Sequence, residues 1–213
     1  MNWLEVKKKS VGKRYEVSII LVALFLFLVP SIALTGVTED ESGFYLGLAL
    51  MGTSFHSDLN SSVFNIKEDG GGAQISVGYR FNPVFMLEVA ASGSNHETSN
   101  SAIDAEVTSA QIFGYYRFLP EKTFRPYIKC GLAGYSLKLH YGSASARLNG
   151  GGIAIGVGFK CFLSRRFSLG VDFTHDMIKY DKAELSLGDF SYELSTDEHG
   201  RLTTLGITAG YSF

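Results

Sequence analysis

Two short stretches place a histidine beside hydroxyl or carboxylate side chains, the combination used in general base catalysis. They are "SFHSD" at 54–58 and "THDM" at 174–177. A nucleophile, its base and an orienting acid must lie within hydrogen-bond reach of one another, and neither stretch fixes such an arrangement by its spacing. We therefore expect no catalytic residues and no enzyme.

The histidines are also poor candidates for metal ligands. None of the five shows the H-x₃-H type of spacing that is common in zinc sites. They are His56, His96, His140, His175 and His199. We expect neither a metal site nor a cofactor.

The overall composition excludes one class of partner and indicates a class of fold. The formal net charge is −2, without the basic stripe of a nucleic-acid-binding protein, so no nucleic acid is expected. Charged residues make up 19% of the chain, below the roughly 25% usual for soluble domains. With 24 Gly and only 4 Pro, the chain is suited to many strands joined by tight turns.

The first 33 residues have the features of a cleaved signal peptide. Basic residues between Lys7 and Arg14 precede the apolar run "SIILVALFLFLV" at 18–29, and the small residues of "SIA" follow at 31–33. The alternative is an uncleaved membrane helix, but this run is shorter than the roughly 20 residues that a helix needs to span. We predict a signal peptide over 1–33 and a single mature domain over 34–213.

The mature chain contains eight segments in which apolar residues occupy every second position. Such segments of about ten residues, separated by turns, are typical of transmembrane β-barrels. The predicted strands are Gly43–Gly52, Gly72–Phe81, Val84–Ser92, Val107–Phe118, Pro126–His140, Gly151–Leu163, Phe167–His175 and Arg201–Phe213. The last long connection contains "AELSLGDFSYEL", which alternates about a Gly-Asp pair and suggests a small hairpin above the barrel.

Strands with one apolar face occur both in barrels in lipid and in soluble sandwiches, so the residues on the other face of each strand distinguish the two folds. Ile75 and Val77 alternate with Ser76 and Gly78, and Ile153 and Ile155 lie in the same kind of pattern. Small residues suit the interior of a narrow barrel, whereas a solvated sheet face would carry many Lys, Glu and Thr. We therefore expect the apolar faces to contact lipid and the sheet to close on itself.

Aromatic residues and the lengths of the connections indicate which end of the barrel faces the periplasm. Short turns alternate with long polar connections, as in outer-membrane barrels, whose periplasmic turns are short. The aromatics near the short turns predict an interfacial girdle: Tyr79, Phe81, Phe85, Tyr116, Phe118, Phe124, Tyr127, Phe159, Phe167, Tyr211 and Phe213. The candidates for the opposite belt are Phe55, Tyr141, Phe173 and Tyr180.

Six charged residues fall on the inward phase, in the half of each strand nearer the short turns. They are Arg80, Glu88, Arg117, Lys129, Lys160 and Asp172. Hairpin geometry predicts that Lys160 lies close to Asp172 and Arg80 close to Glu88. One interpretation is a selective conduit lined by four bases and two acids. The other, which the narrowness of an eight-stranded lumen favours, is an ionic plug.

Cys130 and Cys161 fall on the lipid-facing phase of neighbouring strands. If the connection between Tyr141 and Gly150 sets the register, the two cysteines lie opposite each other, with Cα atoms within the roughly 7 Å that a disulfide requires. The alternative is a pair of small apolar residues that face lipid.

The long connections are predominantly acidic. Between His56 and Gly200 they hold 13 acids and 4 bases: Asp58, Glu68, Asp69, Glu97, Asp104, Glu106, Asp176, Asp181, Glu184, Asp189, Glu193, Asp197 and Glu198 against Lys67, Arg147, Lys179 and Lys182. They could bridge to lipopolysaccharide through divalent cations or bind a basic partner. They could equally be a solvated surface.

Six blocks in order resemble a known family. "SGFYLGLALM", "GGAQISVGYRFNPVFMLEVA", "TSAQIFGYYRF", "FRPYIKCGLAGY", "GGIAIGVGFKCFLSRRFSLGVDFTH" and "TLGITAGYSF" are similar to the OmpA-like, OmpX-like and opacity-type porin family of Gram-negative outer-membrane β-barrel domains. The resemblance implies an eight-stranded antiparallel barrel in the cell outer membrane.

The same resemblance implies how the chain reaches its membrane. Periplasmic chaperones and the barrel-assembly machinery would be partners, the latter recognising the alternating C-terminal residues Leu205, Ile207, Ala209, Tyr211 and Phe213. Some barrels of this size modify lipid A, but the "HxSN" pattern of a lipid A deacylase is absent here.

Together these patterns predict a monomeric outer-membrane barrel in contact with outer-membrane lipid and lipopolysaccharide. Its expected role is structural, or surface binding, such as adhesion, through the acidic loops. The alternative is a narrow pore for small solutes, and a lipid A-modifying enzyme is the third hypothesis.

Overall fold

The computed structural model describes residues 42–57, 66–98, 103–141, 144–187 and 190–213. The predicted signal peptide lies outside these residues. The described residues contain no helix that is long and apolar enough to span a membrane.

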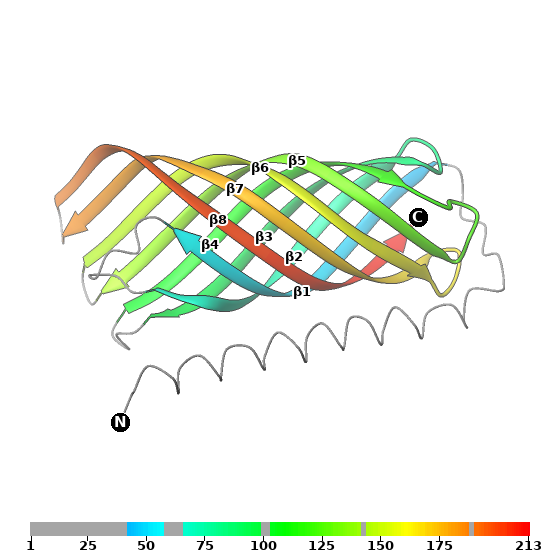
Figure 1. Ribbon diagram of the computed structural model, residues 1–213, viewed down its shortest axis with the longest axis horizontal. Coiled ribbons are helices and arrows are strands. Elements are labelled where there is room, and N and C mark those ends of the chain that lie inside the picture. Colours follow the sequence, from blue (N-terminus) through cyan, green and yellow to red (C-terminus); the bar gives the residue numbers. More distant parts are fainter. Residues whose placement is uncertain (1–41, 58–65, 99–102, 142–143, 188–189) are drawn as a thin grey trace, which may run out of the picture.

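Eight antiparallel strands form one closed barrel in chain order, with β1 paired to β8 (Figure 1). Closure leaves no sheet edge, so the backbone groups of every strand find partners within the sheet. The strands are β1 (Gly43–Ser57), β2 (Ile66–Arg80), β3 (Phe85–Thr98), β4 (Ile103–Arg117), β5 (Phe124–Tyr141), β6 (Ala144–Phe162), β7 (Phe167–Leu187) and β8 (Phe190–Ser212).

The predicted fold class and all eight strands are confirmed, but the strands are longer at the end away from the short turns. β7 was expected to end at His175 and continues to Leu187, opposite Phe190 of β8. The predicted Gly-Asp hairpin is therefore the tip of these two strands, not a separate unit. A register irregularity between Tyr180 and Lys182 marks where the extension begins (Figure 1, orange).

The orientation of the side chains follows the prediction. Ile75 and Ile153 are 52% and 53% exposed on the outer surface, while Ser76 and Ala154, their neighbours in sequence, are buried inside. Outward-facing apolar residues occur on all eight strands. Such a surface is stable only against an apolar solvent, as hydrocarbon is.

A girdle of aromatic rings surrounds the short-turn end, as expected. Tyr79 contacts both Phe44 and Phe81, with ring centroids 5.1 Å apart in each pair. Tyr116 contacts Phe85 and Phe118 in the same edge-to-face manner.

Three assignments to the aromatic belts were wrong. Tyr127, Phe55 and Tyr180 are buried inside the barrel. Each lies on the inward phase of its strand, and their large rings fill the lumen instead of anchoring at an interface.

Two buried clusters fill the interior at different heights. The cluster nearer the short turns packs aromatic rings around charged groups and contains Tyr45, Met86, Phe113, Tyr115, Tyr127 and Ala154. The cluster in the outer half is largely aliphatic and aromatic: Phe55, Ala105, Val107, Ala133, Tyr135, Leu137, Leu139, Leu148, Ile178, Tyr180 and Leu202. The outer half of the described barrel thus has an apolar core of its own.

Leu132, which is 68% exposed at mid-height, gives a direct test of the orientation of the sheet. We expect Leu132→Arg to reduce the free energy of unfolding in lipid vesicles by about 2–4 kcal/mol, because it places a charge in hydrocarbon. The control, His56→Arg near the outer rim, should change it by about 1 kcal/mol or less. Urea titrations followed by gel mobility measure both, and equal effects would contradict the orientation.

Candidate functional site

The six charged residues predicted to face inward all lie in the lumen, between 1% and 8% exposed. They come from β2, β3, β4, β5, β6 and β7 and share the half nearer the short turns. Because unpaired charges are costly to bury, their partners determine what this site can do.

Asp172 on β7 is the centre of a satisfied network. Its Oδ1 accepts hydrogen bonds from Lys129 Nζ at 2.7 Å and from Thr174 Oγ1 at 2.7 Å. Its Oδ2 accepts one from the Tyr127 hydroxyl at 2.6 Å. A carboxylate held by an ammonium and two hydroxyls is a satisfied structural ion pair inside the lumen.

Glycines on β6 allow this network to form between β5 and β7. A Cβ at Gly156 would lie 2.7 Å from Lys129 Cε, and a Cβ at Gly158 would lie 2.5 Å from the Tyr127 hydroxyl. Lys129 and Tyr127 therefore reach Asp172 across the intervening strand only because β6 has no side chain there.

Lys160 and Asp172 lie close to each other, as predicted, but they are not directly opposite. In the register Lys160 lies opposite Gly170 and Asp172 opposite Gly158, so the two are diagonal neighbours. Lys160 Nζ instead lies 3.8 Å from the centroid of the Tyr45 ring. A cation over an aromatic face is stabilised without a carboxylate.

Arg80 and Glu88 are likewise close but not directly opposite, because Arg80 lies opposite Met86 and Glu88 opposite Gly78. Glu88 accepts a hydrogen bond from the Tyr115 hydroxyl at 2.7 Å. Arg80 donates to Ser212 Oγ at 3.3 Å, on the last strand.

Two buried charges were missed from the lumen set: Arg125 on β5 and Asp176 on β7, each 1% exposed. Arg125 fell just before the predicted strand Pro126–His140, and Asp176 was counted among the outer acids. Both continue the inward alternation of their strands, so extending each pattern by one step would have found them.

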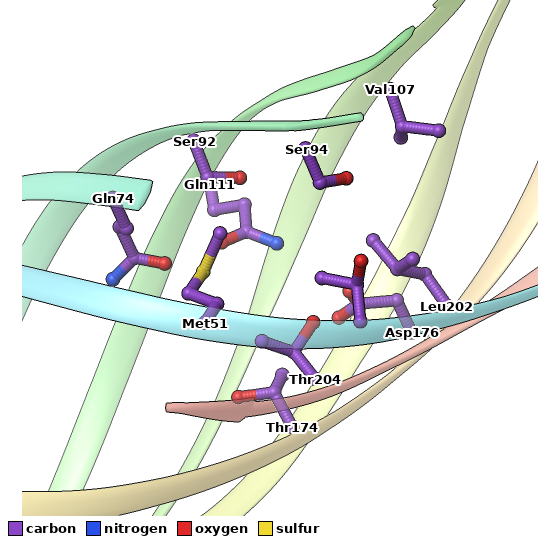
Figure 2. A pocket seen from close by; sticks show the side chains of 11 residues that line it. Met51, Gln74, Ser92, Ser94, Val107, Gln111, Thr174, Asp176, Leu202 and Thr204 are labelled. Atoms are coloured by element: carbon purple, nitrogen blue, oxygen red, sulfur yellow. The ribbon is translucent and has the colours of Figure 1, made fainter. Parts of the chain in front are cut away.

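A small polar cavity lies beside Asp176, below the apolar outer cluster (Figure 2). Gln111, Ser94, Thr174 and Thr204 also line it, and the space open to the centre of a water molecule is about 10 Å³. That is room for about one water. The Asp176 Oδ1 atom, buried and without a hydrogen-bond partner among the described residues, is positioned to receive it.

A second cavity of the same size lies among Tyr45, Glu88 and Lys129. The described lumen thus offers water-sized spaces between packed clusters, which supports the plug interpretation over the conduit.

The predicted proximity of Cys130 and Cys161 is wrong, although both face outward. Cys130 lies opposite Ile155 and Cys161 opposite Phe124, so neither can bridge to the other, and both are free. The reason is the connection between β5 and β6. Pairing continues to Tyr141 and Ala144, which shifts the register by six residues from that expected for a long loop.

The neighbouring residues of "THDM" face opposite sides of the sheet. His175 Nδ1 lies 3.0 Å from Thr203 Oγ1 and is partly exposed, while Asp176 is buried in the lumen. The two side chains therefore cannot act on one another as base and orienting acid.

The five residues of the predicted assembly signal share the outward phase of β8. Tyr211 contacts Phe213, and the Phe213 amide donates to the Phe44 carbonyl at 3.0 Å, joining the last strand to the first. The alternating end of the chain is therefore the seam at which the barrel closes.

The outer surface carries charges of both signs. Lys179 and Asp197 pair at 2.8 Å, and the hydrogen bond from Lys179 lowers the pKa of the Asp197 carboxyl. Arg147 and Glu184 lie 4.0 Å apart. Six of the 13 predicted outer acids have side chains outside the description: Asp58, Glu68, Glu97, Asp104, Asp189 and Glu193.

Comparisons with known proteins agree with this architecture. The family model described as outer membrane protein beta-barrel domain matches residues 19–213. The structure of Neisserial surface protein A has a TM-score of 0.64 at 19% identity, covering 82% of this chain and 100% of that one. OprG from Pseudomonas aeruginosa has a TM-score of 0.56 at 14% identity, covering 83% of this chain and 99% of that one. Ail from Yersinia pestis has a TM-score of 0.52 at 16% identity, covering 82% of this chain and 99% of that one. No curated protein matches the sequence.

The requirement for glycine on β6, where Tyr127 and Lys129 reach Asp172, can be tested with a pair of alanine substitutions. Gly158→Ala should destabilise the folded barrel by about 1–3 kcal/mol, because the new methyl group would lie 2.5 Å from both the Tyr127 hydroxyl, which binds Asp172, and the Val171 carbonyl oxygen. Gly151→Ala is the control, since its Cβ would meet only the Ala133 carbonyl oxygen at 3.7 Å. Urea unfolding midpoints measure the stability of both variants. Similar losses of stability would contradict the view that β6 must lack a side chain at this point.

The filled lumen predicts the absence of steady conductance. The refolded protein, verified by its heat-dependent gel mobility, should give no sustained single-channel steps in planar bilayers. Stable, ion-selective steps would show that the plug opens.

Proposed function

Because the chain belongs to the outer membrane protein beta-barrel domain family and is an outer membrane β-barrel protein, we propose that it works through its outer surface, by binding or structural contact, and not by passing solutes. The observation that carries this proposal is the packed interior. Charged and aromatic groups fill one half of the lumen, and an apolar core fills the other.

β7 and β8 are the longest strands of the described barrel, and their extension forms part of that outer surface. Residues 181–197 contain five acids and one base, a net charge of −4 within 17 residues. Paired strands support this segment, from Lys182 opposite Ser195 to Leu187 opposite Phe190. An acidic projection held by paired strands favours contact with a basic partner, because complementary charge steers association.

A surface-binding role is also consistent with the names of similar proteins. Ail is an attachment invasion locus protein, and a second structure of it, with a TM-score of 0.53 at 16% identity, contains the heparin analogue sucrose octasulfate. That ligand is anionic, whereas the acidic projection described above favours the opposite charge.

The outer-membrane location suggests further partners. Outer-membrane lipid and lipopolysaccharide surround the exposed apolar band. Periplasmic chaperones and the barrel-assembly machinery act during biogenesis, with the outward residues of β8 as the recognised signal. We propose that the folded chain remains a monomer.

Shortening the extension tests the proposed binding role. Tyr180 lies directly opposite Glu198, so residues 181–197 can be replaced by Asn-Gly, which closes a two-residue hairpin. In phosphatidylcholine nanodiscs, the full barrel should bind a labelled oligolysine peptide, more weakly as salt rises, and the shortened barrel should bind it several-fold less tightly.

The control retains the hairpin and removes only charge: Asp181→Asn, Glu184→Gln and Glu193→Gln together. It should weaken peptide binding nearly as much as shortening does. If the full, shortened and neutralised barrels bind the peptide equally, the acidic projection is not the binding surface.

A further inference from the structure

Asp176 is a buried carboxylate that lines the cavity shown in Figure 2. It lies on the inner face of β7 and is 1% exposed. The Tyr135 hydroxyl is hydrogen-bonded to this carboxyl, but the Oδ1 atom has no hydrogen-bond partner among the described residues. A neutral hydroxyl satisfies an oxygen atom and supplies no charge. A buried carboxylate is costly unless a positive charge pairs with it.

The neighbouring charges do not balance Asp176. Those that act on it are Lys129, which attracts it, and Asp172, which repels it. These two bind each other at 2.7 Å, so together they contribute no net charge. The second cavity, nearer the short turns, is also lined by Glu88 and Lys160, which makes two acids and two bases. The remaining buried bases of the described lumen lie at strand ends beside the short turns: Arg80, Arg117 and Arg125.

The cavity beside Asp176 is rich in oxygen atoms. Its polar lining consists of one carboxylate, two amides and five hydroxyls, and none of the residues described as lining it is basic. Thr174 and Thr204 line it from opposite positions on β7 and β8. Because the Thr174 hydroxyl donates its hydrogen to Asp172, its oxygen can only accept from, or coordinate, an occupant of the cavity.

We propose that this cavity binds one sodium ion, with Asp176 Oδ1 as its charged ligand and the oxygens of Thr174 and Thr204 as neutral ligands. The space fits one water-sized particle, and a sodium ion is no larger. Small hard cations prefer oxygen ligands, and a single positive charge matches the single uncompensated carboxylate. A water molecule would complete the hydrogen bond to Oδ1 but would leave the charge of Asp176 in place.

The chemistry of the lining also argues against other metal ions. Calcium sites usually combine several carboxylates, and the described residues contain no group of three His, Cys, Asp or Glu that could hold a metal. The histidine spacing that argued against a zinc site has no bearing on a cation held by oxygens alone. The inference does not depend on the proposed surface function, since the ion is held inside the lumen.

Refolding in different salts tests the proposal with the mature chain. The barrel is refolded into phosphatidylcholine vesicles in sodium chloride or in choline chloride, at equal ionic strength and the same mildly alkaline pH. Choline is too large for the cavity. The urea midpoint, followed by circular dichroism of the β-sheet, should be higher in sodium by about 0.5 M or more, because an ion that binds only the folded state stabilises it.

A pair of neutralised acids locates the ion. Asp176→Asn removes the charge with little change in shape, so its urea midpoint should be the same in both salts. The matched control is Asp181→Asn on the exposed outer surface, which should keep the full sodium effect. Equal midpoints of the wild type in the two salts would overturn the proposal, and so would an Asp176→Asn variant that retains the sodium effect.

A second variant keeps the proposal testable even if Asp176→Asn fails to fold. Thr204→Val preserves the shape of the side chain and removes one proposed ligand oxygen. It should raise several-fold the sodium concentration that gives half of the stabilisation. An unchanged concentration would show that the ion binds elsewhere, and would overturn the proposal.

Discussion

The backbone of a chain in hydrocarbon must satisfy its own hydrogen bonds, and the rest of this structure depends on that requirement. With eight strands, it is met only when β1 pairs with β8, which places Phe213 beside Phe44. The resulting lumen is narrow, so the residues on its inner face must pack and pair with one another as a protein core does. The dense interior is thus a consequence of strand number.

Within that lumen, the absence of side chains matters as much as their presence. Gly156 and Gly158 remove the barrier between β5 and β7, and so allow Tyr127 and Lys129 to share Asp172. The charged layer is therefore specified by strand register. The outer half is specified differently, by aliphatic and aromatic packing around residues such as Leu137 and Tyr180.

The number of strands, the closure of the sheet and the outward orientation of the Ile153 side chain could be predicted, because the alternation of apolar residues is a local property of the sequence. Pairing across strands could not, since it depends on the turns. The tight connection after Tyr141 moved Cys130 away from Cys161. Arg125 and Asp176 were missed for a related reason: polar residues near strand ends resemble loops, although their phase already placed them inside. The lumen residues were therefore largely found, and their partners were not.

Cys130 offers the most direct test of the central claim that the apolar face meets lipid and the packed face forms the core. In a Cys161→Ser variant reconstituted in vesicles, a nitroxide attached to Cys130 should collide readily with dissolved oxygen and rarely with a water-soluble nickel complex. A label at Ala133, introduced as Ala133→Cys, should be inaccessible to both because that position is buried. A label on Cys130 that meets the nickel complex freely would show that this face is solvated, and would contradict the account.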